Sequence, residues 1–372
     1  MKKTGTITFH ASNNNGSFLQ AYALQKIILD KLKINNEIIN LCSSKTENLY
    51  RLIRPIKKSA DVLRTIVSIL LYKKLKKREE CFDIMRKRHL KLSKLLKSES
   101  EALDCAQNYD CVIAGSDQIW NITAHDFVKS FFLPNVKTKK ITYAISCGSN
   151  INSMDLSQFA EYINGFSELS TREINSAKII SNIYKNGDVK TVLDPTLLLN
   201  QEQYADLYDA DKRMIEKPYI FLYSINYNKE VLKTAKRMSK IMGLPVVTIF
   251  NSYHAIMSTF FGIKVIYDAG PAEFLNLMKN AKCVLTNSFH GTAFSIIFKK
   301  QFYHLTTAEN GHVLKDDRIN GLLAKLDLDQ DISFYSTEKE IFEKSNIDYV
   351  FVYNKLEILR KESFDYLEHS LL

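Results

Sequence analysis

One stretch of the chain is decisive for the fold: residues 283–295 read CVLTNSFHGTAFS. The run 283–286 is apolar and β-branched, which predicts a buried strand. The dipeptide His290-Gly291 then turns into an apolar helix. A buried strand that passes through a short polar loop into a helix is the repeating unit of a parallel sheet covered by helices.

The same alternation of strand and helix patterns continues along the rest of the chain. Expected strands cover residues 5–9, 37–41, 111–114, 141–146, 191–193, 219–225, 246–250, 265–267 and 283–286. Expected helices cover residues 18–32, 60–96, 155–166, 229–242 and 272–280. This order favours an α/β fold with parallel sheets that carry helices on both faces.

The length of 372 residues suggests two domains. The stretch 194–218 is polar and charged and precedes a new strand, so we place the boundary there. We expect a Rossmann-like domain over 1–200, with a basic helical insertion at about 50–100, and a second one over 201–372 that carries His290. The last helix is a candidate for packing back on the first domain. Two doubly wound domains are expected to face each other across a cleft, with ligands beyond the carboxyl ends of the strands.

The positive charge of the chain is concentrated in one region. The net charge is +10, but residues 51–98 alone hold 16 Lys or Arg against 4 Asp or Glu, a net charge of +12. An apolar stripe at 62–71 is followed there by KKLKKR at 73–78. In one interpretation the stripe packs on the N-terminal domain and the lysines face water. In the other the region docks on anionic lipid head groups or a lipid-linked substrate.

Several classes of partner and cofactor are not expected. The N-terminus lacks the apolar core of a signal peptide, and no stretch reaches about 18 apolar residues. We therefore expect a cytoplasmic protein, with attachment to the inner face of the cell membrane as the option that the basic insertion raises. No nucleic-acid-binding motif is present, so nucleic acid is not an expected partner. No His and carboxylate cluster has metal-ligand spacing, so no metal is expected.

The stretch 283–295 also supplies candidate functional residues. Asn287 and Ser288 end the strand, and Ser288, Thr292 and the helix N-terminus can donate to phosphate oxygens. Gly291 lets a ligand approach the backbone closely. His290 suits a proton donor, because the unperturbed pKa of histidine lies near neutrality. A purely structural histidine is the alternative.

A second candidate segment is Gly115-Ser116-Asp117, which directly follows an apolar strand. It places a small residue, a hydroxyl and a carboxylate at the carboxyl edge of a sheet, where ligands bind in such folds. Trp120 is the only tryptophan of the chain and is a candidate for stacking on a sugar. The alternatives are a capping role for Asp117 and a core position for Trp120.

Two further segments follow expected strands. Asn14, Gly16 and Ser17 lie in a loop before a helix whose free N–H groups can hold an anion or sugar oxygens, although an ordinary capped turn explains them equally well. Arg172 and Glu173 follow a short strand. The planar arginine fork suits bidentate binding of carboxylate or phosphate, and the alternative is an ion pair with Glu173 or another acid.

In this order and spacing, the motifs resemble those of the polysaccharide pyruvyl transferase family. They comprise Asn-x-Gly with Leu-Gln-x-Tyr-Ala-Leu at 14–24, Gly-Ser-Asp-Gln-Ile-Trp-Asn at 115–121, Tyr-Ala-Ile-Ser-x-Gly at 143–148, Ser-x-Arg-Glu at 170–173, Leu-Asp-Pro-Thr-Leu-Leu at 193–198, Thr-Asn-Ser-Phe-His-Gly-Thr-Ala-Phe-Ser at 286–295, and a late Arg-Ile-x-x-Leu-Leu that begins at Arg318. The resemblance covers most of the chain and explains the basic insertion least.

The resemblance implies a GT-B-like arrangement of two Rossmann-like domains and phosphoenolpyruvate as the donor substrate, with no cofactor. The product would be a pyruvate ketal that bridges two hydroxyls of one sugar in a bacterial surface polysaccharide, such as a capsule or exopolysaccharide. The family's catalytic histidine maps onto His290 and its donor-binding arginine onto Arg172. We expect His290 to act as general acid, Arg172 and Arg318 as anion clamps, and Asp117, from its position, as base or acceptor anchor.

Two other functions stay open at this point. A glycosyltransferase with a nucleotide-sugar donor would use the same fold. A non-catalytic relative that binds carbohydrate or membrane is the second. The acceptor of the pyruvyl transferase could itself be a lipid-linked oligosaccharide or a nucleotide sugar.

Overall fold

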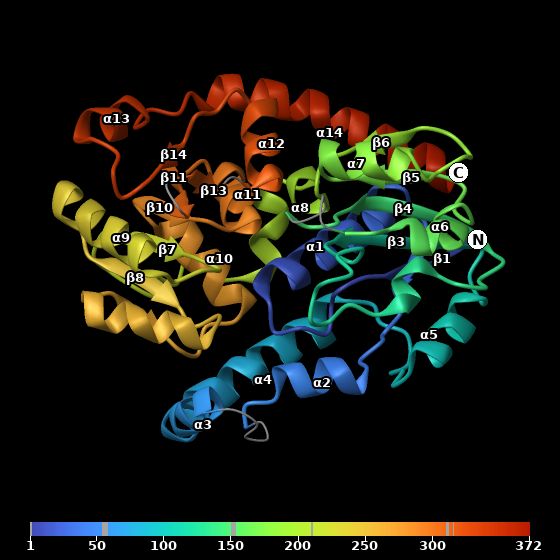
Figure 1. The fold of residues 1–372 in the computed structure, drawn as a ribbon, viewed down its shortest axis with the longest axis horizontal. Helices are drawn as coiled ribbons and strands as arrows, with labels where there is room; N and C mark the ends of the chain where they lie inside the picture. The colour runs from blue at the N-terminus through green and yellow to red at the C-terminus, as the bar shows by residue number, and fades with distance from the viewer. Residues whose placement is uncertain (1, 54–58, 150–153, 210, 310–311, 315) are drawn as a thin grey trace. The chain divides into compact units, whose positions relative to one another are not determined.

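The computed structural model describes the chain except residues 1, 54–58, 150–153, 210, 310–311 and 315. The chain divides into two compact units (Figure 1). Unit 1 comprises Met1–Arg51, Arg86–Leu199 and Glu357–Leu372, and unit 2 comprises Leu52–Met85 and Asn200–Leu356. The crossing at 199–200 lies within the expected boundary, but the chain also crosses at 51–52, 85–86 and 356–357, so each unit contains separate segments of the chain.

The basic insertion does not belong entirely to the N-terminal unit, contrary to the expected division. Its residues 52–85 are part of unit 2. The physical reason is an apolar cluster in which Leu75 packs with Phe250 and Val265. The last segment, 357–372, belongs to unit 1, where the Tyr366 hydroxyl donates to the carbonyl of Thr142 at 3.0 Å.

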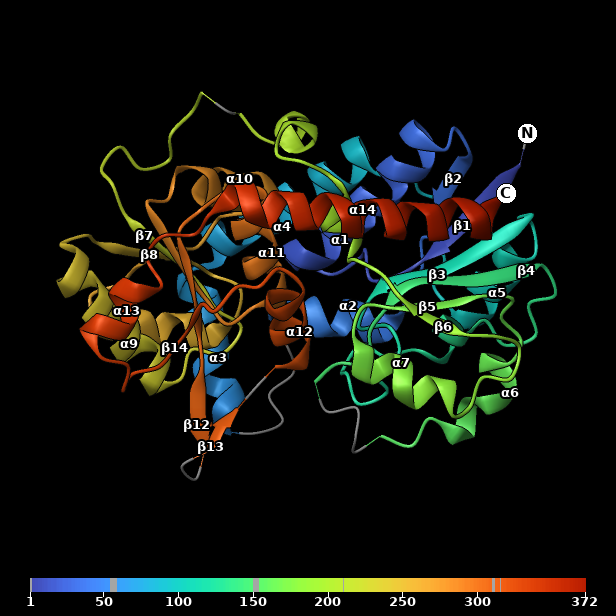
Figure 2. The same ribbon diagram turned by 90° about the horizontal axis from the view of Figure 1, so that it is seen from above.

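Unit 1 contains a parallel six-stranded sheet in the order β2-β1-β3-β4-β5-β6. Its strands are β1 (Lys3–Ile7), β2 (Asn35–Ile38), β3 (Cys111–Asp117), β4 (Lys139–Ile145), β5 (Leu169–Thr171) and β6 (Val189–Thr191). Its helices include α1 (Asn15–Lys26) with a π-helical extension (Ile27–Lys31), α2 (Ser44–Tyr50), α5 (Glu99–Ala106), α6 (Ala160–Ile163), α7 (Ile174–Ser181) and α8 (Pro195–Leu198). Short 3-10 segments cover Lys129–Phe132 and Ser157–Phe159. Figure 2 shows α1 and α14 (Tyr349–Leu371) on one side of these strands and α6 and α7 on the other.

Unit 2 contains a second parallel six-stranded sheet, in the order β14-β11-β10-β7-β8-β9. Its strands are β7 (Ile220–Tyr223), β8 (Val246–Ile249), β9 (Lys264–Ile266), β10 (Cys283–Thr286), β11 (Phe302–Leu305) and β14 (Asp331–Ile332). Its helices include α3 (Ser59–Leu70), α9 (Lys229–Met242), α10 (Pro271–Asn280), α11 (Phe289–Ile297), α12 (Asp317–Lys325) and α13 (Glu338–Glu343), with 3-10 segments at Glu202–Leu207 and Tyr253–Phe261. The hairpin β12 (Thr307–Glu309) and β13 (His312–Leu314) is antiparallel. Helix α4 (Tyr72–His89) belongs to both units.

Both sheets are doubly wound, and each has a point at which the strand order reverses. In unit 1 the order runs outward from the neighbouring strands β1 and β3, and in unit 2 it runs outward from β7 and β10. Open parallel sheets bind ligands beyond the carboxyl ends of the strands at this switch point. The expected fold class, α/β with two Rossmann-like doubly wound units, is therefore confirmed, and each unit has one favoured site for a ligand.

Candidate functional site

The switch point of unit 1 brings together residues that lie 100 positions apart in the sequence. Asn14 caps α1, and its Oδ1 accepts from the backbone N–H groups of Gly16 at 2.9 Å and Ser17 at 3.4 Å. The Ser17 hydroxyl then donates to Oδ2 of Asp117 at 2.9 Å. Asp117 is the last residue of β3, which pairs with β1, so the loop after β1 and the end of β3 meet at this edge. Both segments thus lie at strand ends, as expected, and the structure brings them together at one edge.

Gln20 holds this edge together, and the sequence analysis did not select it. Its amide nitrogen donates to Oγ1 of Thr8 and to the carbonyl of Ser17, both at 2.9 Å. Its amide oxygen accepts from the backbone N–H of Ser116 at 3.2 Å. The available signal was a glutamine on the apolar helix α1, because a fully buried amide needs partners for all its polar atoms.

Arg172 lies in a buried ion-pair network. Its Nε contacts Oε1 of Glu173 at 2.7 Å, and one terminal nitrogen contacts Oδ2 of Asp194 at 2.9 Å. Burial alone would lower the pKa of Arg172, but the carboxylates of Glu173, Asp194 and Asp117 outweigh it and raise the pKa, so the guanidinium stays charged. This geometry matches the alternative that the sequence left open, a structural ion pair with Glu173 and another acid.

Asp194 is a second residue that the selection of candidate residues missed. One of its carboxylate oxygens accepts from the Ser116 hydroxyl at 3.3 Å and contacts Arg172. The other accepts from the backbone N–H of Thr196 at 3.0 Å, as the cap of α8. The signal was present in Leu-Asp-Pro-Thr, because an aspartate before a proline at the first helical position marks a helix start.

Two candidates in the Gly-Ser-Asp segment have packing roles, which corrects their assignment to a ligand. Trp120 is fully buried, stacks on Phe132 with centroids 4.7 Å apart, and donates its indole N–H to the carbonyl of Phe131 at 3.2 Å. No exposed face is left to stack on a sugar. Gly115 has a φ of +133°, and a Cβ there would lie 2.1 Å from the carbonyl oxygen of Tyr143. Glycine is therefore needed for the close approach of β3 to β4.

The switch point of unit 2 is formed by the end of β10 and the loop after β7. Oδ1 of Asn287 accepts from the backbone N–H of Ile225 at 2.8 Å and from the Ser224 hydroxyl at 3.0 Å. Ser288 caps α11, and its Oγ accepts from the N–H of Gly291 at 3.5 Å. Asn287 and Ser288 therefore shape this edge by binding backbone, before any ligand is considered.

Gly291 and Thr292 also have local structural roles, which corrects the expectation that they serve a ligand directly. A Cβ on Gly291 would lie 2.1 Å from Oγ1 of Thr286 and 2.9 Å from Cδ1 of Tyr223. The glycine thus lets α11 pack against the strands. The Thr292 hydroxyl is fully buried and donates to the carbonyl of Ser288 at 3.2 Å.

His290 occupies the first turn of α11, directly beyond β10. It retains 9% of its surface exposed, and its ring meets the Phe289 ring edge-on with centroids 5.4 Å apart. Within 286–292 it is the one titratable side chain. The start of an α-helix carries partial positive charge, which favours a negatively charged group nearby.

Arg318 is bound by a neighbour in its own helix start. Its Nε donates to Oδ1 of Asp316 at 2.8 Å, and a terminal nitrogen contacts the other oxygen of the same carboxylate. The fork that was expected to clamp a substrate anion thus faces Asp316, the cap of α12.

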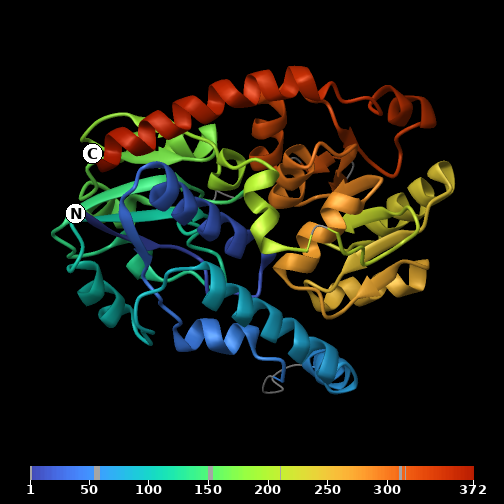
Figure 3. The same cartoon turned by 180° about the vertical axis from the view of Figure 1, so that it is seen from behind.

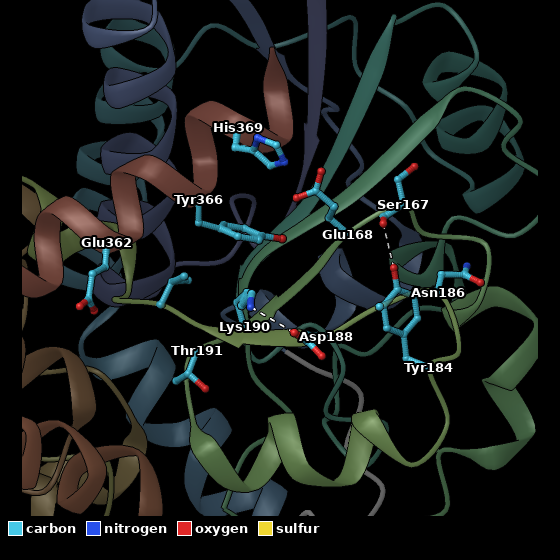
Figure 4. Close-up of a pocket in the computed structure, with 12 residues that line it drawn as sticks. Ser167, Glu168, Tyr184, Asn186, Asp188, Lys190, Thr191, Glu362, Tyr366 and His369 are labelled. Carbon is cyan, nitrogen blue, oxygen red and sulfur yellow. Dashed lines mark hydrogen bonds and ion pairs between the residues drawn. The ribbon is translucent and has the colours of Figure 1, made fainter.

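Two cavities of unit 1 are lined by described residues only. The larger, of about 510 Å³, is lined mainly by residues that precede β5 and β6 and by α14; Figure 4 shows Glu168, Tyr184, Tyr366 and His369 among them. It does not include the switch-point residues. The smaller, of about 20 Å³, lies beyond β1 and includes Ser12 and Asp126, and it has room for about one water. Burial raises the pKa of Asp126 there.

The comparison with protein families decides the affiliation of the chain. The model of the family described as polysaccharide pyruvyl transferase matches residues 14–309. The chain belongs to this polysaccharide pyruvyl transferase family. The match includes His290 and the Arg172 network, while Arg318 lies beyond its end. No curated protein matches the chain in sequence.

Solved structures similar to this pyruvyl transferase family member share its fold. S. aureus MnaA, in a co-structure with UDP, is 14% identical, with 96% of this chain and 90% of that chain covered and a TM-score of 0.52. UDP-GlcNAc 2-epimerase from Methanocaldococcus jannaschii, in complex with UDP-GlcNAc and UDP, is 14% identical, with 97% and 93% covered and a TM-score of 0.52. The epimerase from Neisseria meningitidis bound to UDP-GlcNAc is 10% identical, with 98% and 100% covered and a TM-score of 0.51.

Proposed function

We propose that the protein transfers the enolpyruvyl group of phosphoenolpyruvate to two hydroxyls of one sugar, forming a pyruvate ketal in the biosynthesis of a bacterial surface polysaccharide. The observation that carries the proposal is the family match over 14–309. His290 lies inside the match, in the first turn of a helix at the switch point of unit 2. The proposed reaction needs a proton donor and a site for a multiply charged anion, and this position suits both.

The proposed reaction begins with protonation of phosphoenolpyruvate and ends with the release of phosphate. His290 protonates the methylene carbon of phosphoenolpyruvate, which leaves an oxocarbenium-like centre at the adjacent carbon. One sugar hydroxyl attacks this centre, phosphate leaves by cleavage of the carbon–oxygen bond, and the second hydroxyl closes the ring. Of the two hydroxyl protons, one restores the proton that His290 gave to the new methyl group, and the other leaves with phosphate. The N–H groups at the start of α11 stabilise the anionic donor.

In unit 1 we assign Asp117 the role of base or acceptor anchor. Its carboxylate accepts from the Ser17 hydroxyl and is 6% exposed, so its orientation is fixed. A sugar hydroxyl is a suitable partner for such a carboxylate. For Arg172 we propose a positioning role, in which the guanidinium fixes the carboxylates of Glu173 and Asp194. The competing role, a donor clamp, predicts a different outcome on substitution, as set out in the Discussion.

A nucleotide-sugar enzyme is the second candidate. The observation in its favour is that structures of similar fold are epimerase complexes with UDP or UDP-GlcNAc. Two forms of this candidate exist: a glycosyltransferase with a nucleotide-sugar donor, or a pyruvyl transferase whose acceptor is a nucleotide sugar. The released group separates them, because the first frees a nucleoside diphosphate and the second frees inorganic phosphate.

The test is an incubation of the purified protein with phosphoenolpyruvate and, in parallel, nucleotide-linked and lipid-linked sugars. Release of phosphate that depends on the acceptor, together with a mass gain equal to pyruvate minus water on that acceptor, is the expected result. Release of nucleoside diphosphate without phosphoenolpyruvate would instead establish the glycosyltransferase. The proposal would be contradicted if no acceptor yielded either product and the protein bound phosphoenolpyruvate no better than phosphate.

A further inference from the structure

Helix α3 is attached to unit 2 by its polar side. The Ser68 hydroxyl is fully buried and lies 2.6 Å from the Tyr253 hydroxyl. The Arg64 guanidinium lies over the Tyr253 ring, 4.4 Å from its centroid. Leu71 follows on the same side and packs against an apolar cluster of unit 2. At 3.6 residues per turn, positions 64, 68 and 71 share one face, so this face is inward.

The opposite face of α3 is apolar and exposed. Its side chains retain large fractions of their surface: Val62 44%, Leu63 67%, Ile66 49%, Ile69 59% and Leu70 77%. These positions recur at the helical period and form one stripe. A surface helix normally shows the reverse orientation, with the apolar side inward, and an exposed apolar stripe marks an interaction surface. The stripe is thus exposed and does not pack on unit 2, the unit to which α3 belongs.

Cations lie next to this stripe. Lys73, Lys74 and Lys76 are exposed on α4, immediately after α3 (Figure 3, blue helices). The segment 51–98 that includes both helices has a net charge of +12. A second copy of the same surface would bring like charges together, which opposes pairing of this face with itself. An anionic lipid surface has an apolar layer in which the stripe can be buried and negatively charged head groups that attract the lysines.

We propose that α3 and the start of α4 form a docking surface for anionic phospholipid membranes, with the stripe 62–70 lying in the head-group region. Within the described residues every helix is too short or too polar to span a bilayer, and α3 has 12 residues. An amphipathic helix of this kind lies in the plane of the interface. The proposal rests on exposure and charge alone, and it stands whether or not the proposed reaction is correct.

The test uses vesicles of phosphatidylcholine with and without phosphatidylglycerol, in a flotation assay with the full chain. The wild-type protein should float with phosphatidylglycerol vesicles at low salt and should be released by high salt. The triple variant Lys73→Gln, Lys74→Gln, Lys76→Gln should bind at least tenfold more weakly, since each lysine near an anionic surface contributes about fivefold in affinity. Lys77 is left intact because it pairs with Asp268 of another element at 2.7 Å, whereas the pair of Lys76 with Glu79 at 3.3 Å lies within α4.

A second variant removes the stripe and keeps the charge. Leu63→Gln with Ile66→Gln and Leu70→Gln should lose at least tenfold in binding, because apolar burial supplies the other part of the affinity. The matched control is Phe342→Gln with Val350→Gln, two exposed apolar residues of unit 2 on α13 and α14, which should bind like the wild type. Melting curves of all variants show whether the fold is kept.

Fluorescence gives a direct readout of insertion. The native Trp120 is fully buried in unit 1, so lipids with brominated acyl chains should leave its emission unchanged. The variant Leu63→Trp places a second indole in the stripe, and its emission should be quenched on vesicles that contain phosphatidylglycerol. Failure of the wild type to float at low salt, or binding by the stripe variant equal to that of the wild type, would overturn the proposal. So would a wild-type dimer in solution that the stripe variant converts to a monomer without any vesicle binding.

Discussion

Both units have a switch point in a parallel six-stranded sheet, but the chemistry of the two switch points differs. In unit 1 the charged side chains at the carboxyl edge of the sheet bind groups of the same edge: Arg172 binds Glu173 and Asp194, and Asp117 binds Ser17. In unit 2 the corresponding edge is made of neutral amides and hydroxyls at a helix start, with His290 as its titratable group. A network of satisfied charges holds a shape, whereas a histidine in the first turn of a helix is a titratable group near the positive end of the helix dipole. Under the proposed function, the first edge supplies a rigid frame and the second supplies the proton donor.

The largest effect should come from the unit 2 edge. His290→Ala removes the proposed general acid, and general acid catalysis contributes about 10²–10⁴-fold. Turnover with phosphoenolpyruvate should fall by that factor, while the thermal unfolding midpoint stays close to that of the wild type. His254→Ala, which removes an exposed histidine of the same unit, is the control and should keep full turnover. Wild-type turnover in the His290 variant would remove the distinction between the two edges.

The next largest effect should come from breaking the charged edge. Arg172→Met leaves the carboxylates of Glu173 and Asp194 buried without their cation, which costs about 3–5 kcal/mol in such pairs. Urea unfolding of the variant measures this loss. Lys190→Met is the control, because the partly exposed pair of Lys190 with Asp188 contributes little to stability.

Arg172→Lys separates positioning from clamping. If Arg172 holds the two carboxylates, the lysine variant should lose stability and turnover together. A variant with wild-type stability and a strongly raised KM for phosphoenolpyruvate would instead identify Arg172 as a donor clamp, since a point charge cannot reproduce the bidentate fork.

Local signals explain which elements could be predicted from the sequence. The helix expected over 229–242 has those bounds because Asn228 caps its start and Gly243, with a φ of +64°, ends it. The strand expected over 283–286 also has those bounds, since three buried apolar residues followed by a buried threonine favour a strand. Strand β14 has only two residues and is defined by its pairing with β11, so the local sequence pattern does not predict it.

The strand ends that carry the candidate residues could be predicted from the sequence, but the pairing of their side chains could not. Motifs at strand ends located both switch points, because the carboxyl ends of parallel strands share one edge. The sequence could not say that Arg172 reaches Asp194, 22 positions away, or that the Thr292 hydroxyl is taken by its own helix. Such pairings depend on side-chain direction in the folded sheet. Trp120 shows the same limit, since a tryptophan suits a core as well as a sugar.

A smaller effect is expected from the packing that supports His290. Gly291→Ala forces a Cβ against Thr286 and Tyr223, and overpacking of this kind costs about 1–3 kcal/mol. Turnover should fall as well, because α11 and its first turn must shift. Gly321→Ala is the matched control: a Cβ there meets no atom within 4 Å, so the change should be neutral or stabilising in α12. Equal stability of the two variants would show that α11 does not depend on this close approach.

The smallest effect concerns His10, a titratable group just beyond β1 in unit 1. Burial lowers the pKa of His10, Arg86 adds to this, and hydrogen bonds with Asn40 and Thr8 counteract it in part. The folded protein therefore keeps the ring neutral, while the unfolded chain binds a proton below the usual value of 6.5. The contribution of His10 to the free energy of unfolding is fully present above that pH. It declines as the pH falls below it, by at most about 1.4 kcal/mol per pH unit until the folded pKa is reached.

His10→Gln should remove this decline, so the difference in unfolding midpoint between variant and wild type should shift in favour of the variant from about pH 8 to about pH 5. A difference that is constant with pH would mean that folding leaves the pKa of His10 unchanged, and a shift toward the wild type in acid would mean that the ring is held as a cation between the two oxygens that it contacts. In the second case the edge of unit 1 would contain a proton-exchanging group of its own.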